Sequence, residues 1–261
     1  MDLHLGGKTA VVTGASKGIG LAISSALIDA GAHVVAGSRS NSAGLAKLAE
    51  TGNLTHVAVD LTAPDAGAHL VETAAARGGI DILVNNAGAV TPRTGGFASI
   101  SDDDWLATWT LGLMATVRTT RAALPHLIAS GAGTIVMIGS VNAYLPDPIV
   151  LDYSATKAAL TNLAKGLSKE LGPHNIRVNS ISPGPVATDL WLADGGVATT
   201  VAGVTGRSAT DIADGAVADT VTKRFTTAAE VANVAVFLAS DVAANITGTD
   251  VTIDGGMITT I

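Results

Sequence analysis

Tyr153 and Lys157 are the two residues whose types and spacing point most directly to chemistry. They lie four positions apart in the stretch LDYSATK, residues 151–157. On a helix this spacing places both side chains on one face, roughly 5–6 Å apart at Cβ. A lysine cation beside a phenol lowers a pKa that is otherwise near ~10, so that the phenol can pass a proton to or from a reacting oxygen. The pair alone is also typical of a surface tyrosine packed over a lysine stem, so its context has to decide.

A glycine-rich turn near the start of the chain has the context of a dinucleotide-binding loop. The apolar run 9–13 predicts a buried strand, the turn GASKGIG follows at 14–20, and an Ala/Leu/Ile-rich helix continues to about Ala30. Gly14 permits the tight turn, Gly18 lets the backbone approach a pyrophosphate, and Gly20 lets helix and strand pack closely. The helix N-terminus supplies N–H groups for phosphate. The alternative is that this segment is simply a turn.

The end of the second expected strand carries residues that choose between NAD and NADP. That strand covers 33–37, and Ser38 and Arg39 follow it, 24 residues after Gly14. An NAD site has an Asp or Glu near this position, which binds the ribose hydroxyls. There is no carboxylate here to repel a 2′-phosphate, and Arg39 and Lys17 can pair with one. The sequence therefore favours NADP(H) over NAD(H); the alternative is that both cations are solvated surface charges.

Strands alternate with helices along the whole chain. Further strands are expected at 55–61, 80–84, 134–138, 176–181 and 250–253. This alternation predicts an α/β fold, a single-domain Rossmann fold over residues 1–261, with a doubly wound parallel sheet of about seven strands and helices on both faces. One helix is expected from about Trp105 to Ile128, broken near Pro125. The segment 189–222, rich in Gly, Ala, Thr and Asp, is expected to form a mobile substrate flap.

Composition narrows the classes of function. A net charge of −7 without a Lys/Arg run argues against nucleic acid and against an anionic membrane surface. The chain has no cysteine, and its 6 histidines show no metal-binding spacing, so no metal is expected. Without a signal sequence or a long apolar run, the expected location is cytoplasmic. Only 14% of the residues are charged, which predicts that subunits cover part of the surface in a homo-oligomer.

Together these motifs resemble the short-chain dehydrogenase/reductase family, in its compact form. The match spans essentially the whole chain, and its motifs are the glycine-rich loop, Asp60, Asn85-Asn86-Ala87-Gly88, Ser140, Tyr153-xxx-Lys157, Pro183-Gly184 with Thr188, and Asp254-Gly255-Gly256. Within the family the chain looks most similar to the members that resemble 3-oxoacyl-(acyl carrier protein) reductase. Members are commonly tetramers, so the resemblance implies a homotetramer.

The resemblance also implies roles for the site residues. Ser140 would hydrogen-bond the substrate oxygen, Tyr153 would be the general acid in reduction and the base in oxidation, and Lys157 would bind the nicotinamide ribose and depress the pKa of Tyr153. The residues expected at the cofactor are Gly14, Ser16, Lys17, Gly18, Ile19, Gly20, Ser38, Arg39, Asp60, Leu61, Asn86, Ala87, Gly88, Tyr153, Lys157, Pro183, Gly184, Val186 and Thr188.

The expected function is that of an NADP(H)-dependent oxidoreductase acting on a ketone or secondary alcohol. The mix of side chains near the site suggests an uncharged or modestly polar substrate, and Arg93 would either meet an anionic substrate tail or be solvated. The expected pocket contains Ser140, Asn142, Tyr144, Leu145 and Trp191, with further contributions from Pro146, Leu192 and residues 90–97. One alternative is an NAD-dependent alcohol dehydrogenase, and another is a nucleotide-sensing protein that keeps the fold without catalysis.

One position departs from the family pattern. Counted from Trp105, the family's catalytic asparagine falls at position 112, where this chain has Gly112. The glycine could still distort the helix, because a glycine inside a helix is about 1 kcal/mol less stable than an alanine, or it could leave room for a water. It cannot supply the amide group. A neighbouring group such as Asn142 could take part in a proton relay. This departure is the feature that supports the nucleotide-sensing alternative.

Overall fold

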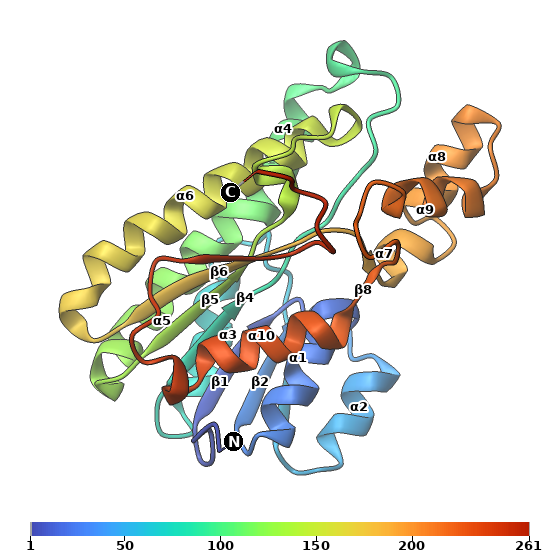
Figure 1. The fold of residues 1–261 in the computed structure, drawn as a ribbon. Coiled ribbons are helices and arrows are strands. Elements are labelled where there is room, and N and C mark those ends of the chain that lie inside the picture. Colours follow the sequence, from blue (N-terminus) through green and yellow to red (C-terminus); the bar gives the residue numbers. More distant parts are fainter. Residues whose placement is uncertain (1, 261) are drawn as a thin grey trace.

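A seven-stranded parallel sheet forms the centre of the protein. The computed structural model describes residues 2–260 of the chain. The strands lie in the order β3-β2-β1-β4-β5-β6-β9 (Figure 1), which confirms the expected doubly wound sheet. Their bounds are β1 (Thr9–Thr13), β2 (His33–Ser38), β3 (Leu54–Ala58), β4 (Ile82–Asn85), β5 (Thr134–Ile138), β6 (Arg177–Pro183) and β9 (Asp250–Ile253).

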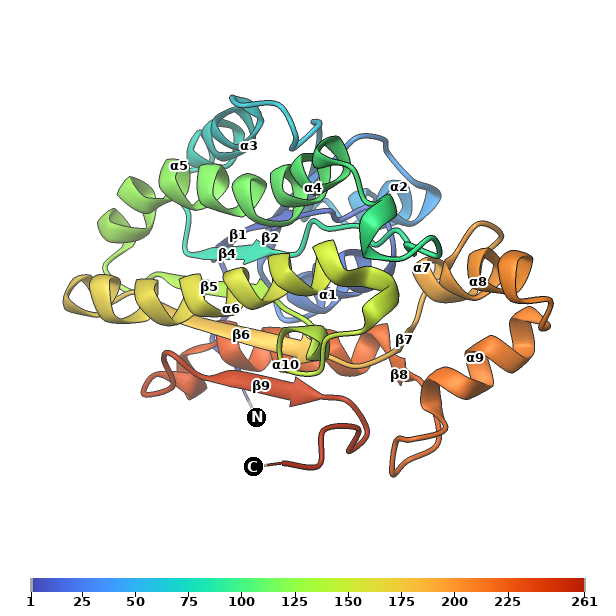
Figure 2. The ribbon, with the colours of Figure 1, turned by 90° about the horizontal axis from the view of Figure 1, so that it is seen from above.

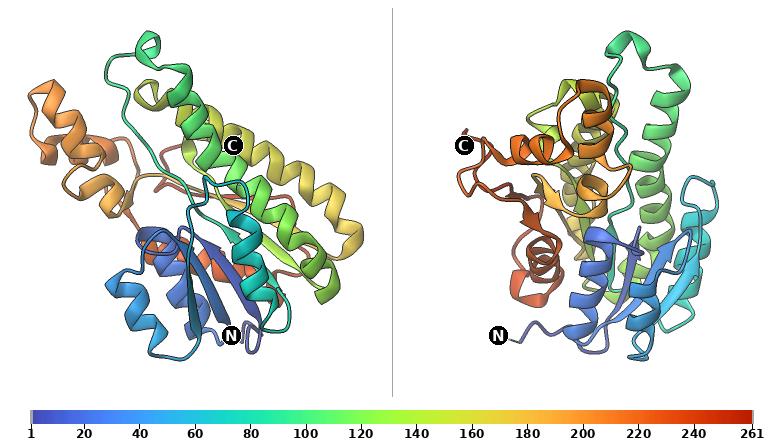
Figure 3. Two further views of the ribbon diagram at one scale, coloured as in Figure 1. Left: turned by 180° about the vertical axis from the view of Figure 1, so that it is seen from behind. Right: turned by 90° about the vertical axis from the view of Figure 1, so that its right-hand side faces the viewer.

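Helices cover both faces of this sheet (Figures 2 and 3). On one face lie α1 (Gly18–Asp29), α2 (Ala43–Ala49) and α10 (Ala228–Ala239); on the other lie α3 (Ala66–Ala75), α5 (Ala115–Ser130) and α6 (Leu151–Leu171). Within residues 2–260, no helix combines the length and the apolar character needed to cross a lipid bilayer.

The two cores explain why the strands read as continuous apolar runs. Along β1, Ala10 and Val12 pack into the core under α1 and α10, whereas Val11 packs into the core under α3, α5 and α6. A strand buried on both faces needs apolar residues at successive positions, not at alternate ones. The chain leaves β1 toward β2 and later returns to β4 on the other side of β1. This reversal of strand order places the ligand crevice at the carboxyl ends of β1 and β4.

The helix expected at 105–128 starts and breaks at other places than predicted. It begins as α4 (Asp102–Trp109), capped by Ser101, continues through the π-helical turn η2 (Thr110–Met114), and ends as α5. The break predicted near Pro125 is wrong, because α5 continues through that residue. Pro125 is exposed, so solvent can hydrate the carbonyl group that its missing N–H leaves free.

Gly112 is buried at the centre of this π-helical turn and faces α6. A Cβ at position 112 would lie 2.5 Å from Cγ2 of Thr156, well inside van der Waals contact. The residue beside Lys157 on α6 therefore requires a glycine on the facing helix. π-helical turns are frequent at functional sites. This one contacts α6 at Thr156, which lies between Tyr153 and Lys157 in the chain.

The segment expected to be a flap contains three helices: α7 (Asp189–Leu192), α8 (Val197–Thr205) and α9 (Ala209–Val217). They stand away from the sheet at its carboxyl edge (Figure 1). A short parallel pair, β7 (Val186–Ala187) and β8 (Thr226–Thr227), joins the two ends of the segment at its base. Its mobility stays a prediction.

The contact at Gly112 predicts an unusual response to alanine. Replacing an exposed glycine in a helix by alanine usually stabilises the protein by up to about 1 kcal/mol. This result is expected for Gly166→Ala in α6, where a Cβ would have no atom within 4 Å. Gly112→Ala is instead expected to lower the free energy of unfolding by about 1–3 kcal/mol, because it overpacks the contact with Thr156. Urea denaturation of both variants measures the difference.

Thr156→Ser is the companion change that checks the cause. It removes the methyl group that the new Cβ would strike and keeps the hydroxyl, which donates to the carbonyl of Asp152 at 2.8 Å. Combined with Gly112→Ala, it should recover most of the lost stability. An equal loss with and without Thr156→Ser would show that this contact is not the reason for the glycine.

Candidate active site

A cavity of about 640 Å³ follows the carboxyl edge of the sheet. It is lined by the segments that leave β1, β2, β4, β5 and β6, and by side chains of α6 and α7. Every residue expected at the cofactor lines it, and of the residues expected at the substrate Ser140, Asn142, Leu145, Pro146, Trp191 and Val90 do so. The residues that the motifs single out are therefore brought together at one place, as parallel strand ends require.

The glycine-rich loop forms the end of the cavity next to β1. Gly14 has a positive φ of 65°, which a side chain would strain, and a Cβ at Gly20 would overlap the carbonyl oxygen of Gly14. The first turn of α1 has no acidic residue, and its N-cap, Lys17, makes no side-chain capping bond. The N–H groups at this helix end are thus left for an anion from outside the chain, which fits a pyrophosphate.

Ser38 and Arg39 lie at the edge of the cavity beyond this loop. Ser38 is buried, and its hydroxyl bonds to the carbonyl of Ser40 at 3.0 Å and to a ring nitrogen of His56 at 3.0 Å. Arg39 is exposed, and among residues 2–260 neither Arg39 nor Lys17 has a carboxylate partner within 4 Å. Two cations without acidic partners at this edge fit the 2′-phosphate of NADP(H).

Asn86 connects the ends of β1 and β4 behind the loop. Its side-chain amide donates to the carbonyls of Thr13 at 2.9 Å and Gly14 at 3.1 Å, while the Thr13 hydroxyl accepts from the N–H groups of Asn86 and Ala87. The preceding Asn85 points away from the cavity and donates to the Thr120 hydroxyl at 3.0 Å. The two amides thus have different tasks, one at the cavity and one between β4 and α5.

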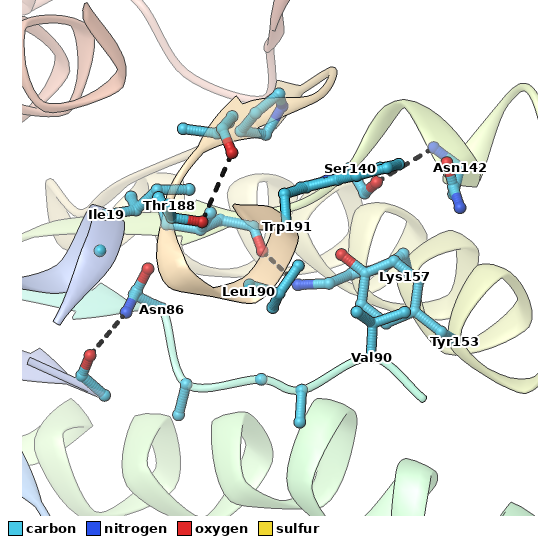
Figure 4. A pocket seen from close by; sticks show the side chains of 18 of the residues that line it. Ile19, Asn86, Val90, Ser140, Asn142, Tyr153, Lys157, Thr188, Leu190 and Trp191 are labelled. Carbon is cyan, nitrogen blue, oxygen red and sulfur yellow. Dashed lines mark hydrogen bonds between the residues drawn. The ribbon is translucent and has the colours of Figure 1, made fainter. Parts of the chain in front are cut away.

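Ser140, Tyr153 and Lys157 converge at the other end of the cavity (Figure 4). Ser140 follows β5, and its Oγ accepts the N–H of Asn142 at 3.2 Å, which leaves its hydroxyl hydrogen free to point elsewhere. Lys157 is only 4% exposed, its Nζ donates to the carbonyl of Ile138 at 2.6 Å, and Nζ lies 5.6 Å from the centre of the Tyr153 ring. Leu190 and Trp191 of α7 lie opposite (Figure 4).

Burial shifts both titrating groups of this cluster. It raises the pKa of the Tyr153 phenol, and the neighbouring Ser140 hydroxyl offsets part of that rise. It lowers the pKa of Lys157 to about 8, because an ammonium group is poorly solvated there. The expected depression of the Tyr153 pKa by Lys157 is therefore absent in the protein alone. Burial therefore moves the two pKa values apart: that of Tyr153 rises above its ordinary value, and that of Lys157 falls toward the neutral range.

Tyr144 is the expected pocket residue that the structure places elsewhere. Tyr144 follows the turn η3 (Val141–Ala143) and lies half-exposed outside the cavity, although Asn142 before it and Leu145 after it both line the cavity. Its burial on the other side, together with the Asp250 carboxylate, raises the pKa of its phenol. The expected contribution of Leu192 is also wrong, and of the segment 90–97 only Val90 lines the cavity.

Several lining residues were not foreseen from the sequence. Asp147, Leu190, Ala216 and Met257 all reach the cavity. Leu190 and Ala216 belong to the segment 189–222, which was expected to cover the substrate, but the sequence did not single out these two residues. Met257 is brought back by a turn in which the Asp254 carboxylate accepts N–H groups from Gly256 and Ile258; a three-residue motif does not reveal where the tail then goes.

The shifted pKa of Lys157 predicts a pH-dependent stability. An unfolded lysine titrates near ~10.4, so below about pH 8 the folded protein carries the full penalty of a buried ammonium. As the pH rises from 8 to 10.4 the unfolded chain binds more protons than the folded one, and the folded state gains up to about 3 kcal/mol. The Lys157→Met variant cannot show this gain. Between pH 8 and 10.4 the unfolding free energy of the variant should therefore decrease relative to that of the wild type.

Urea denaturation of the two proteins between pH 7 and pH 10.5 measures this difference. Other titrating groups are shared, and their contributions cancel in the comparison. A difference that stays constant with pH would mean that Lys157 keeps an ordinary pKa.

Known proteins with this arrangement share both the sequence pattern and the fold. A family model described as short chain dehydrogenase matches residues 8–194. The L-sorbose reductase of Gluconobacter frateurii, solved in complex with NADPH and L-sorbose, is 36% identical and superposes over 100% of both chains with a TM-score of 0.91. The uncharacterized oxidoreductase YvrD of Bacillus subtilis is 35% identical over 99% of each chain.

The likeness to 3-oxoacyl reductases is also found. The 3-oxoacyl-[acyl-carrier-protein] reductase of Thermotoga maritima is 32% identical over 98% of this chain and 100% of its own. The residues matched by the family model, 8–194, include the glycine-rich loop, the ends of β1 to β6 and the Tyr153–Lys157 pair. The chain belongs to the short-chain dehydrogenase/reductase family.

Proposed function

We propose that this protein is an NADP(H)-dependent oxidoreductase that transfers hydride between the nicotinamide and a ketone or secondary alcohol. The observation that carries the proposal is the convergence of Ser140, Tyr153 and Lys157 at one end of a cavity whose other end is the glycine-rich loop after β1. A cofactor and a small substrate can therefore meet in one continuous space. The Gluconobacter relative, solved with NADPH, supports the choice of cofactor class.

The proposed chemistry needs three side chains. A bound NADPH supplies the hydride, and NADP⁺ accepts one in the reverse direction. The Ser140 hydroxyl, whose oxygen is already held by the N–H of Asn142, donates to the carbonyl oxygen and stabilises its growing negative charge. Tyr153 gives its phenolic proton to that oxygen in reduction and takes it back in oxidation. Lys157 supplies positive charge beside the phenol.

The distribution of charge along the cavity supports an uncharged substrate. The basic side chains of the lining are Lys17 and Arg39, at the cofactor's phosphate end, and Lys157. The lining residues near Ser140 include the apolar Leu190 and Trp191 and the amide of Asn142. Two further lining residues, Asp147 and Asp189, add carboxylates, which repel an anion. A neutral ketone with hydroxyl groups fits this end better than a carboxylate or phosphate substrate. A sugar ketone, the class to which L-sorbose belongs, is one candidate.

The homotetramer expected from the sequence stays a prediction. Apolar side chains near α4 support a subunit contact there, because Phe97 is 68% exposed, Leu106 is 62% exposed, and Trp109 is also exposed. Exposed large apolar residues that gather on one surface are typical of protein interfaces.

The first test of the proposal is turnover. The purified protein is titrated with NADPH and NADH, and oxidation of NADPH is followed with β-keto esters, cyclic ketones, diketones and sugar-derived ketones. Turnover with a preference for NADPH supports the proposal and shows that Gly112 does not stop the proton relay. Turnover with NADH alone would favour the NAD-dependent alternative. Tight NADPH binding without turnover on any class would favour a nucleotide-sensing protein.

Tyr153→Phe tests the acid–base role. Loss of the proton donor is expected to lower kcat by about 10²–10⁴, while the dissociation constant of NADPH changes less than about threefold. Tyr144→Phe is the matched control, since Tyr144 lies outside the cavity, and it should keep full activity. If the Tyr153 variant retained most of its turnover, a different group would have to supply the proton.

Ser38→Asp combined with Arg39→Ala tests the cofactor choice. The new carboxylate repels a 2′-phosphate and can accept the ribose hydroxyls, and the lost guanidinium removes a charge-assisted bond of about 1.5–3 kcal/mol. NADPH should bind at least ~10-fold more weakly and NADH more tightly, as measured by quenching of protein fluorescence. Arg77→Ala, at the opposite edge of the sheet, should change neither constant. An unaltered preference would mean that Arg39 is only a solvated charge.

A further inference from the structure

Arg93 is neither solvated nor free to meet a substrate. It lies in the loop after β4, its side chain is 13% exposed, and it binds two carboxylates at once. Nε and Nη2 donate to Oδ2 of Asp152 at 3.1 and 2.6 Å, and Nη1 donates to Oδ1 of Asp104 at 2.7 Å. A planar guanidinium can bridge two acids in this way, whereas a lysine ammonium is a single point of charge.

Asp152 is the centre of this arrangement and directly precedes Tyr153. Its side chain is 2% exposed, and both carboxylate oxygens are bonded. Oδ2 accepts from Arg93 and from the Thr108 hydroxyl at 2.7 Å, and Oδ1 accepts the N–H of Tyr153 at 3.0 Å. Burial alone would raise the pKa of Asp152, but the bonds from Arg93 and Thr108 outweigh it and hold this pKa below its ordinary value. Asp152 is thus ionised and fully bonded.

These bonds connect three segments around the substrate end of the cavity. The N–H of Arg93 also donates to the carbonyl of Ile149 at 2.6 Å, just before α6. Asp104 and Thr108 belong to α4. The loop that carries Arg93 also carries Val90, which lies on the same side of the cavity as Tyr153 (Figure 4). The loop, α4 and the first turn of α6 are therefore held together one residue away from the phenol.

We propose that the Arg93–Asp152 pair is a positioning device for Tyr153, which fixes the first turn of α6 and the loop bearing Val90 in the geometry that proton transfer requires. The inference rests on the proposed function for its catalytic readout. Neither Arg93 nor Asp152 lines the cavity, so the proposal makes them positioning residues. A shift of about 1 Å at a reacting group is enough to lower a rate about 100-fold.

The alternative is an ion pair that only stabilises the fold, and the choice of variants separates the two. Removing one partner would leave a buried, unpaired charge and could unfold the protein. The main variant is therefore Arg93→Met with Asp152→Asn, which removes both charges and keeps an amide that can bond to Thr108. Arg93→Lys is the conservative variant. Lys8→Met, which breaks the Lys8–Asp81 pair at the opposite edge of the sheet, is the matched control.

The measurements are kcat and KM with NADPH and a ketone that the wild type reduces, and NADPH binding by fluorescence. The double variant is expected to bind NADPH within about threefold of the wild type and to lose at least tenfold in kcat, with Arg93→Lys in between and Lys8→Met unchanged. A merely structural pair would leave kcat of the folded variants near the wild-type value. That result would overturn the proposal, and if the double variant did not fold, full activity of Arg93→Lys would overturn it as well.

A second readout does not depend on turnover. The chain has only 2 tyrosines, so 3-fluorotyrosine gives two fluorine signals, which Tyr144→Phe assigns. The Tyr153 signal should shift and broaden in the double variant and stay in place in Lys8→Met. An unchanged signal would overturn the positioning role even if no ketone substrate were found. If Tyr153→Phe kept its activity, the acid assignment would fail, and the fluorine signal would still decide whether the pair positions this ring.

Discussion

The buried ammonium of Lys157 is the constraint on which the rest of the site depends. It is held by one hydrogen bond to the last carbonyl of β5, and this bond joins α6 to the carboxyl edge of the sheet. An ammonium group has three N–H donors, and the cavity is the side from which further acceptors can reach it. A charge buried in this way lowers stability unless it is bonded, and its burial accounts for the lowered pKa of Lys157.

The close approach of α6 is matched on its other side by a change in the facing helix. Gly112 removes the side chain that would strike Thr156, and the π-helical turn around it adapts α4 and α5 to this contact. Position 112, where the family pattern predicts an asparagine, thus carries a glycine that packs against α6 next to the Tyr153–Lys157 pair.

Much of this arrangement could be predicted from the sequence, because it follows from local pattern. Apolar runs marked the strands, and a parallel sheet necessarily brings their carboxyl ends together, so Ser140, Asn86 and the glycine loop had to meet. What could not be predicted depends on contacts between distant segments. The π-helical turn reflects Thr156 on another helix, and Arg93 finds acids 11 and 59 positions away. The capping box Ser208–Asp211 of α9, by contrast, was a local signal that pattern reading could have used.

The pairing of Arg93 links the position of Tyr153 to the choice of substrate. Because Asp104 and Asp152 neutralise this arginine, the loop after β4 brings no free cation to the end of the cavity near Ser140, where Lys157 is the basic residue. The cations that are left, Lys17 and Arg39, lie where the proposed cofactor carries its phosphates. One buried ion pair therefore has two consequences: it fixes the helix that carries the phenol, and it reserves the positive charge of the cavity for the cofactor and for Lys157.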